Sequence, residues 1–91
     1  MSVTVRIPAH LRSLTKGEKL VIASGSTLLD IIEDISRTFP DIKEKLCDGD
    51  GLIRRFITVY INRHLVKTRI AGEIAVHPGD EISILFAMAG G

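Results

Sequence analysis

The chain has 91 residues, of which 45% are hydrophobic and 25% are charged, with a formal net charge of +1. This composition is typical of one small globular domain and argues against a disordered chain. No apolar run approaches the roughly 18 residues that cross a bilayer, and the N-terminus lacks an apolar stretch of signal-peptide length. We therefore expect a cytoplasmic protein, with neither a membrane nor nucleic acid as its partner.

Alternating residues predict a strand at the start of the chain. Val3, Val5 and Ile7 alternate with polar residues up to Pro8, which is the period of two of a half-buried strand. A loop is expected next, through Thr15, Lys16 and Gly17. Residues 18–23 predict a second short strand, so that the two strands form an opening hairpin.

Apolar residues at spacings of three and four then predict a helix. These residues are Leu28, Ile31, Ile32, Ile35 and Phe39. Thr27 precedes them as a good N-cap, and Asp30 lies three residues on, as in a capping box. Pro40 ends the helix, because the residue before a proline is disfavoured in helical conformation.

The second half of the chain predicts a polar loop and three strands. Residues 41–51 form the loop, with one short helical turn inside it. The strands are residues 56–61, 65–66 and 81–86. His77 to Asp80 has proline and glycine at its centre, which indicates a type II turn before the last strand.

These elements predict an α+β roll in which one main helix covers a mixed sheet of four to five strands. We expect a domain of residues 1–86 followed by a flexible C-terminal tail of residues 87–91. The expected core consists of Val3, Val5, Ile7, Leu28, Ile32, Ile35, Ile57, Val59, Ile61, Ile82 and Ile84.

The expected tail is poor in side chains. It consists of Ala87, Met88, Ala89, Gly90 and Gly91, and five extended residues reach roughly 17 Å. Glycine lets the backbone enter a narrow channel of another protein, because no Cβ intrudes. The terminal carboxylate is ionised at neutral pH and can attack the α-phosphorus of ATP. The alternative is a frayed chain end without chemistry.

Five segments resemble the ubiquitin-like sulfur carriers. They are the opening Val3–Pro8, the strand end Val59–Asn62, the turn Pro78–Glu81, the final strand Glu81–Phe86 and the ending Ala89–Gly91. That family includes the small subunit of molybdopterin synthase, the thiamine sulfur carrier and a cysteine-forming sulfur carrier. The opening segment, together with Arg55-Phe56, looks closest to the cysteine-forming carriers. The resemblance covers essentially the whole chain and implies a β-grasp fold.

The resemblance also implies a carrier that partner enzymes act on, and not an enzyme. In that family an adenylating enzyme of the ThiF/MoeB type activates the last glycine with ATP, and sulfur then replaces AMP to give a thiocarboxylate. In this chain the activated residue corresponds to Gly91, and Gly90 is the neighbour without a side chain. The sulfur acceptor that the resemblance favours is a cysteine synthase-like enzyme. The alternatives are the large subunit of molybdopterin synthase and thiamine formation. The chain has no P-loop, so we expect it to bind no cofactor and the partner to bind the ATP.

Three other functions stay open from the sequence. The chain could be a protein modifier in which Gly91 forms an isopeptide bond with a lysine. It could be a subunit that only inserts its tail into a synthase. It could also be a plain β-grasp interaction module whose tail has no chemistry.

Strand parity predicts the side chains on the sheet face away from the helix. This set is Arg6, Phe56, Thr58, Tyr60, Ser83 and Leu85. We expect Leu85 and Phe56 to be neighbours, and to form a docking surface for partners with Tyr60 and Arg6. The alternative is a scatter of surface hydrophobic residues.

Charge and the remaining candidate groups are less informative. Residues 30–50 carry seven acids and three bases, and residues 51–72 carry five bases and no acid, which indicates either two solvated faces or a basic face for an acidic partner. Cys47 lies in the polar loop and is expected to be an ordinary thiol and not a sulfur relay. The three histidines are expected on the surface and show no metal-ligand spacing.

Overall fold

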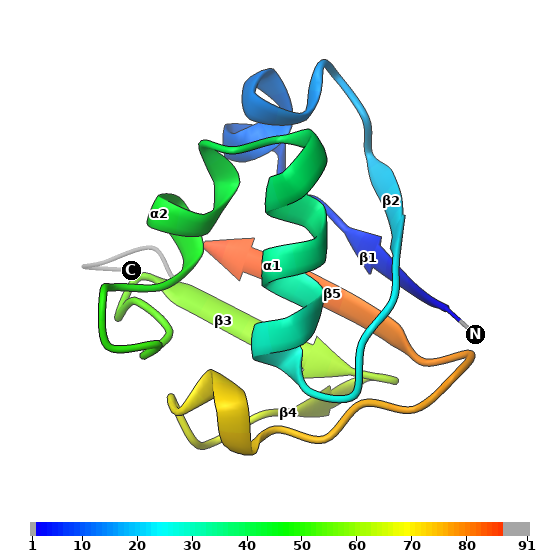
Figure 1. The fold of residues 1–91 in the computed structure, drawn as a ribbon, viewed down its shortest axis with the longest axis vertical. Coiled ribbons are helices and arrows are strands. Elements are labelled where there is room, and N and C mark those ends of the chain that lie inside the picture. Colours follow the sequence, from blue (N-terminus) through cyan, green and yellow to red (C-terminus); the bar gives the residue numbers. More distant parts are fainter. Residues whose placement is uncertain (1, 87–91) are drawn as a thin grey trace.

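The computed structural model describes residues 2–86 of the chain. Its strands and helices follow one another as shown in Figure 1. In chain order they are β1 (Val3–Arg6), the 3₁₀ helix η1 (Ala9–Thr15), β2 (Leu20–Ala23), α1 (Leu28–Thr38), α2 (Ile42–Leu46), β3 (Ile57–Ile61), β4 (His64–Leu65), the 3₁₀ helix η2 (Ala71–Glu73) and β5 (Glu81–Phe86). No helix formed by these residues is long and apolar enough to cross a membrane.

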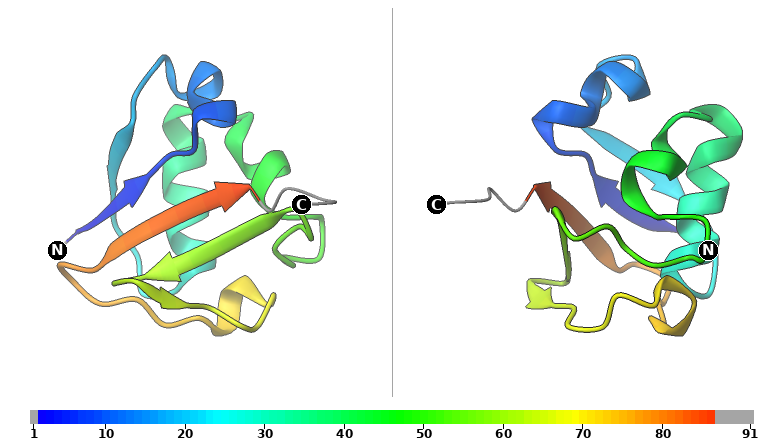
Figure 2. Two further views of the ribbon diagram at one scale, coloured as in Figure 1. Left: turned by 180° about the vertical axis from the view of Figure 1, so that it is seen from behind. Right: turned by 90° about the vertical axis from the view of Figure 1, so that its left-hand side faces the viewer.

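The strands form one five-stranded mixed sheet in the order β2-β1-β5-β3-β4. β1 and β5 are parallel, and the other three neighbouring pairs are antiparallel. The last strand of the sequence therefore lies at the centre of the sheet. α1 crosses one face, and Figure 2 shows the opposite face free of helices. The predicted α+β roll is confirmed.

The core lies between α1 and the sheet. Thr27 and Asp30 form the predicted capping box, in which the Thr27 Oγ1 accepts the Asp30 N–H at 3.2 Å and the Asp30 carboxylate accepts the Thr27 N–H at 3.3 Å. All predicted core residues are buried except Ile61, which is half-buried at the end of β3. Each such side chain contributes about 1.5–3 kcal/mol when it leaves water.

The expected loop after β1 is wrong in part, because residues 9–15 form the 3₁₀ helix η1. Pro8 has no N–H to continue the sheet, and its carbonyl accepts the Leu11 N–H at 2.9 Å. The Leu11 side chain is buried, and so is Thr15, whose Oγ1 donates to the Glu18 carbonyl at 2.9 Å. These contacts hold the segment as a compact turn over the end of the core.

The other predicted elements are confirmed, with small shifts of their ends. The short helical turn is α2, and β5 has the predicted bounds. β3 begins at Ile57 and not at Phe56, and β4 covers His64–Leu65 and not residues 65–66. The predicted type II turn is present, with φ of 88° at Gly79 and an Asp80 N–H to His77 carbonyl distance of 3.0 Å.

Candidate functional site

The sheet face opposite α1 carries a continuous row of side chains across all five strands. Leu20, Arg6, Ser83, Tyr60 and Leu65 are successive Cα partners in the sheet register. Directly opposed residues share one face of a sheet, so these five side chains lie side by side on the face seen from behind in Figure 2. We call this surface the open face.

The open face is richer in exposed apolar groups than the sequence predicted. Leu85 is 46% exposed, as expected of a docking residue, and Arg6 is exposed as well, whereas Tyr60 is half-buried. Leu20 and Ile22 on β2 were missed, although Ile22 is 65% exposed. Their parity with Thr4 and Arg6 across the β1–β2 hairpin was the signal that would have placed them there.

Phe56, which was predicted on the open face beside Leu85, lies outside the strand that would place it there. It lies just before β3, and its ring packs against that of Phe86, with the centroids 5.6 Å apart. The Cα partner of Leu85 is Thr58. Because Phe56 is outside the strand, the pleat does not fix the direction of its side chain, and its place beside Leu85 stays a prediction.

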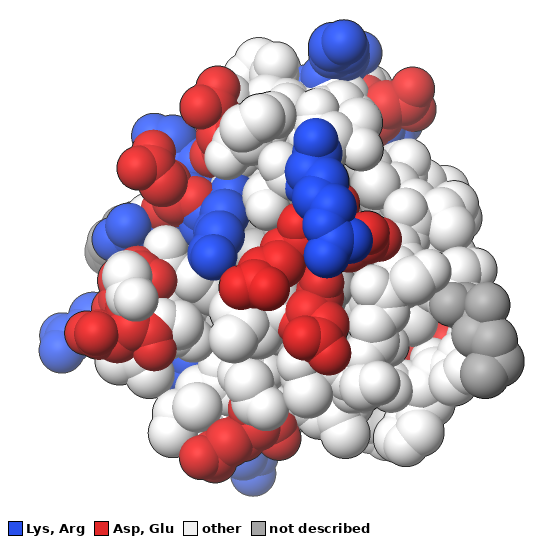
Figure 3. Space-filling model, viewed as in Figure 1, with Lys and Arg blue, Asp and Glu red and all other residues white. Residues whose placement is uncertain are grey.

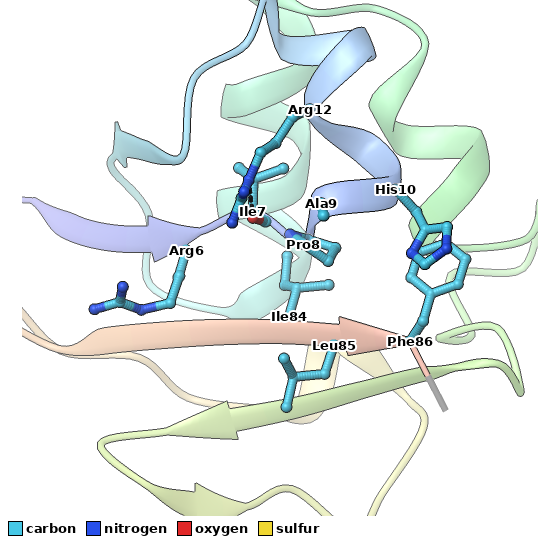
Figure 4. A pocket seen from close by; sticks show the side chains of 9 residues that line it. All are labelled: Arg6, Ile7, Pro8, Ala9, His10, Arg12, Ile84, Leu85 and Phe86. Carbon is cyan, nitrogen blue, oxygen red and sulfur yellow. Dashed lines mark hydrogen bonds between the residues drawn. The ribbon is translucent and has the colours of Figure 1, made fainter. Parts of the chain in front are cut away.

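An aromatic stack closes the end of β5. The His10 ring lies on the Phe86 ring with centroids 5.0 Å apart, and Phe56 packs against the same ring. His10 comes from η1, so the stack joins two segments far apart in the sequence, and Figure 4 shows His10 directly over Phe86. The three rings therefore anchor the last described residue of the chain. No pattern in the sequence predicts this contact, because it depends on the unpredicted helix η1.

The start of β5 is anchored by a second cluster. The Asp80 carboxylate accepts the Asn62 side-chain N–H and the His77 backbone N–H, both at 2.8 Å. The Asn62 side-chain oxygen in turn accepts the Glu81 N–H at 2.9 Å. These hydrogen bonds, that of His77 first, lower the pKa of Asp80. Two of the segments that resemble the sulfur carriers, Val59–Asn62 and Pro78–Glu81, therefore contact each other here and stabilise the start of β5.

Charges are mixed on the helix side of the molecule. Figure 3 shows acidic and basic side chains interleaved there, and two pairs are close: Arg37 with Asp34 at 2.9 Å and Lys43 with Glu33 at 3.2 Å. On the open face, Arg6 lies 3.7 Å from Glu81. Exposed pairs of this kind add little stability.

Cys47 and the histidines are placed as follows. Cys47 is buried at the end of α2, and not in an open polar loop as expected. Burial, and next the charge of Asp48, raise the pKa of this thiol, which disfavours the thiolate that sulfur transfer needs. The three histidines are exposed, as predicted. Residues 2–86 contain no group of side chains suited to a metal ion.

The predicted tail residues Met88, Ala89, Gly90 and Gly91 lie outside the described residues. The structure does show what precedes them. β5 runs through the middle of the sheet, is anchored at both ends, and has Leu85 exposed on the open face next to its last residue.

Comparison with known proteins identifies the family. The family model described as the ThiS family matches residues 5–91. The chain belongs to the ThiS family. Sulfur carrier protein CysO of Mycobacterium tuberculosis is 41% identical over the full length of both chains, and its crystal structure superposes with a TM-score of 0.86 over 94% of this chain and 99% of that one, at 39% identity.

Two other solved structures are similar. A chain in the crystal structure of the Amycolatopsis orientalis BexX/CysO complex is 44% identical, with a TM-score of 0.88 over 98% of this chain and 99% of that one. Small archaeal modifier protein 1 of Methanosarcina acetivorans is 25% identical, with a TM-score of 0.80 over 99% of this chain and 96% of that one. The predicted β-grasp fold is confirmed by these likenesses, and this ThiS-family chain is a ubiquitin-like sulfur carrier.

Proposed function

We propose that the Gly91 carboxylate carries the sulfur as a thiocarboxylate. A partner enzyme of the ThiF/MoeB type would bind ATP and join AMP to this carboxylate with release of pyrophosphate. A sulfur nucleophile would then attack the acyl carbon and displace AMP. The carrier is a substrate in these steps and binds no cofactor of its own. Because the reaction consumes ATP, we expect it to take place in the cytoplasm.

The observation that carries the proposal is the placement of β5. The side-chain-poor sequence Ala87–Gly91 follows directly on the central strand of the sheet. That strand is fixed at its start by Asp80 and at its end by the stack on Phe86. A partner that holds the folded domain therefore also sets the point from which the last five residues start.

We infer that the open face is the surface that partners hold. It presents Leu85, Leu20 and Arg6; Arg6 lies directly opposite Leu20, and each of the two leucine residues is about half exposed. Apolar groups with an arginine among them are typical of the centre of a protein interface. The similar chain of Amycolatopsis orientalis is seen in a complex with BexX, which supports a partner-binding role for this fold.

The sulfur acceptor we favour is a cysteine synthase-like enzyme. The support is the full-length similarity to CysO, together with the resemblance of the opening segment to the cysteine-forming carriers. Molybdopterin synthase and thiamine formation are the acceptors we would test next.

Intact mass spectrometry tests the tail chemistry. The chain is incubated with ATP, a sulfide source and the adenylating enzyme encoded in the same organism. We expect a mass increase equal to the difference between sulfur and oxygen, and no increase for a variant that lacks Gly91. An unchanged mass for the full chain, with an enzyme shown to be active on its own carrier, would refute the proposal.

A matched pair of substitutions tests the docking surface. Leu85→Arg places a charge on the open face, and Ile70→Arg places the same charge at a residue of similar exposure, 43% against 46%, outside the sheet. A charge buried at an interface without a partner is costly, so we expect Leu85→Arg to raise the KM for the carrier at least about tenfold, which corresponds to about 1.4 kcal/mol. Equal effects of the two variants would exclude the open face.

A second candidate is protein modification through Gly91. The likeness to small archaeal modifier protein 1 of Methanosarcina acetivorans favours it, and the same activation step serves both reactions. Blots of cells that express a tagged chain distinguish the two: conjugates of higher mass that vanish on deletion of Gly90 and Gly91 would show modification.

A further inference from the structure

A groove of about 370 Å³ lies between the end of β5 and the segment that leads into η1. Figure 4 shows it from close by. Its lining residues are Arg6, Ile7, Pro8, Ala9, His10, Arg12, Ile84, Leu85 and Phe86. The volume is within the roughly 300–1,000 Å³ of ordinary ligand sites, and the groove opens beside the point where the last five residues of the chain begin.

The groove exists because β1 stops short of the end of β5. The pairing of the two strands ends with Arg6 opposite Ser83. Pro8 would be the next residue of β1 to face β5, but it has no N–H, and its carbonyl already accepts the Leu11 N–H at 2.9 Å. Residues 84–86 of β5 therefore have no strand beside them on this side.

Two backbone groups of β5 face the vacant edge. The Val66 N–H donates to the Val59 carbonyl at 2.9 Å, so the backbone groups of Val59 point towards β4 and away from β5. Ile84 is the Cα partner of Val59. In an antiparallel pair, opposed residues that are not hydrogen-bonded to each other point their backbone groups away from the partner strand. The Ile84 carbonyl therefore points to the groove. The N–H of Phe86, two residues further along the strand, points to the same side.

The groove is also basic. Arg12 uses its Nε to donate to the Ile7 carbonyl at 3.1 Å, which fixes the guanidinium at the rim and leaves its two terminal nitrogens to other partners. Arg6 lines the groove too, and none of the lining residues is acidic. Arg6 has one acidic neighbour, Glu81, at 3.7 Å, and both side chains of that pair are about half exposed.

We propose that this groove binds an extended acidic segment of a partner protein as a short added strand on β5. One residue of the segment would donate its N–H to the Ile84 carbonyl and accept the Phe86 N–H, which continues the parallel ladder where β1 leaves it. The side chain of that residue would fall on the open face, in register with Leu85 and two positions beyond Arg6. A carboxylate there meets the two arginines, with Arg12 as the main contact.

The proposal rests on the proposed function, since it places one contact of a partner enzyme next to the reactive end. It does not depend on the tail chemistry itself. A segment bound here would lie beside Phe86, so a partner that uses it would fix the direction in which Ala87–Gly91 start.

The test uses the full chain, labelled with ¹⁵N, and a capped pentapeptide, acetyl-Ser-Val-Glu-Val-Ser-amide. A titration followed by amide chemical shifts should give saturable changes confined to residues 6–12 and 83–86, with a Kd on the order of 1 mM for so short a segment. Replacing the glutamate by glutamine should weaken binding about tenfold, because an ion-paired hydrogen bond is lost. Methylation of the glutamate backbone nitrogen should abolish the shifts, because it removes the N–H that Ile84 would accept.

Variants of the carrier complete the test. Arg12→Gln removes the charge but keeps a donor for the Ile7 carbonyl, and should weaken binding about tenfold. Lys67→Gln makes the same charge change in an exposed loop beyond β4 and should leave the Kd unchanged. A chain without Gly90 and Gly91 cannot be activated but should bind the peptide as before, which separates this proposal from that of the tail. No saturable shifts, shifts elsewhere, or equal binding of the N-methylated peptide would overturn the proposal.

Discussion

Removal of the Asp80 carboxylate is predicted to destabilise the whole domain. Asp80→Ala removes two hydrogen bonds, from the His77 N–H and the Asn62 side chain, both at 2.8 Å. Hydrogen bonds to a charged group are worth about 1.5–3 kcal/mol each. Water reaches part of this site, since 14% of the Asp80 side chain is exposed, and it will replace some of what is lost. We therefore expect a loss of about 2 kcal/mol in the free energy of unfolding, and a fall in Tm of about 8–16 °C for a domain of this size.

A double-mutant cycle shows whether the loss comes from the link between Asn62 and Asp80. Asn62→Ala also loses the hydrogen bond from the Glu81 N–H, so each single variant loses two bonds, and the double variant loses three. The shared bond should appear as a coupling energy of about 1 kcal/mol.

Urea unfolding followed by far-UV circular dichroism is the suitable assay, because the chain has no tryptophan. Asp41→Ala is the control: it removes the same charge from an exposed position that makes no side-chain cap hydrogen bond, and should change stability by less than about 0.5 kcal/mol. The reasoning is refuted if Asp80→Ala behaves like this control, or if the two single changes are additive within about 0.3 kcal/mol.

The folded-state pKa of Asp80 is lowered. The stability that its carboxylate contributes should therefore be complete above the ordinary carboxyl pKa and disappear as the pH falls through the folded-state pKa. Urea unfolding at a series of pH values should show the difference in stability between the natural chain and Asp80→Asn shrinking over this range. A Cβ at Gly25 would lie 2.5 Å from the Asp30 Cβ, so Gly25→Ala should lower stability by about 1–3 kcal/mol, whereas Thr27→Ala, which removes only the cap, should cost about 1 kcal/mol. Cys47 is buried with a raised pKa, so iodoacetamide should alkylate it at least about tenfold more slowly in the native chain than in urea; equal rates would show that the thiol is accessible.

Periodicity predicted the elements that bury one regular face. The alternation of Val3 and Val5, and the helical spacing of Leu28 and Ile32, gave β1 and α1 together with most of the core. The paired residues of the capping box fixed the start of α1, because Thr27 and Asp30 act on each other within one turn. Such local rules need no knowledge of the rest of the chain.

The parts that escaped prediction depend on contacts between distant segments. η1 has no clear apolar period, and is held by buried Leu11 and by hydrogen bonds from Thr15. The stack of His10 on Phe86 exists only because η1 folds over the end of β5. Leu20 on the open face follows from the register of β1 with β2, and register depends on which face the core selects.

β5 lies between β1 and β3, and its residues Ile82 and Ser83 pair with both strands. An edge strand can fray without disturbing the rest of a sheet, but a central strand can detach only if both ladders break together. Amide hydrogens of Ile82 and Ser83 should thus exchange with solvent only through global unfolding. A force that a partner applies to the end of this chain therefore acts on the central strand, which cannot separate from the sheet without unfolding of the domain.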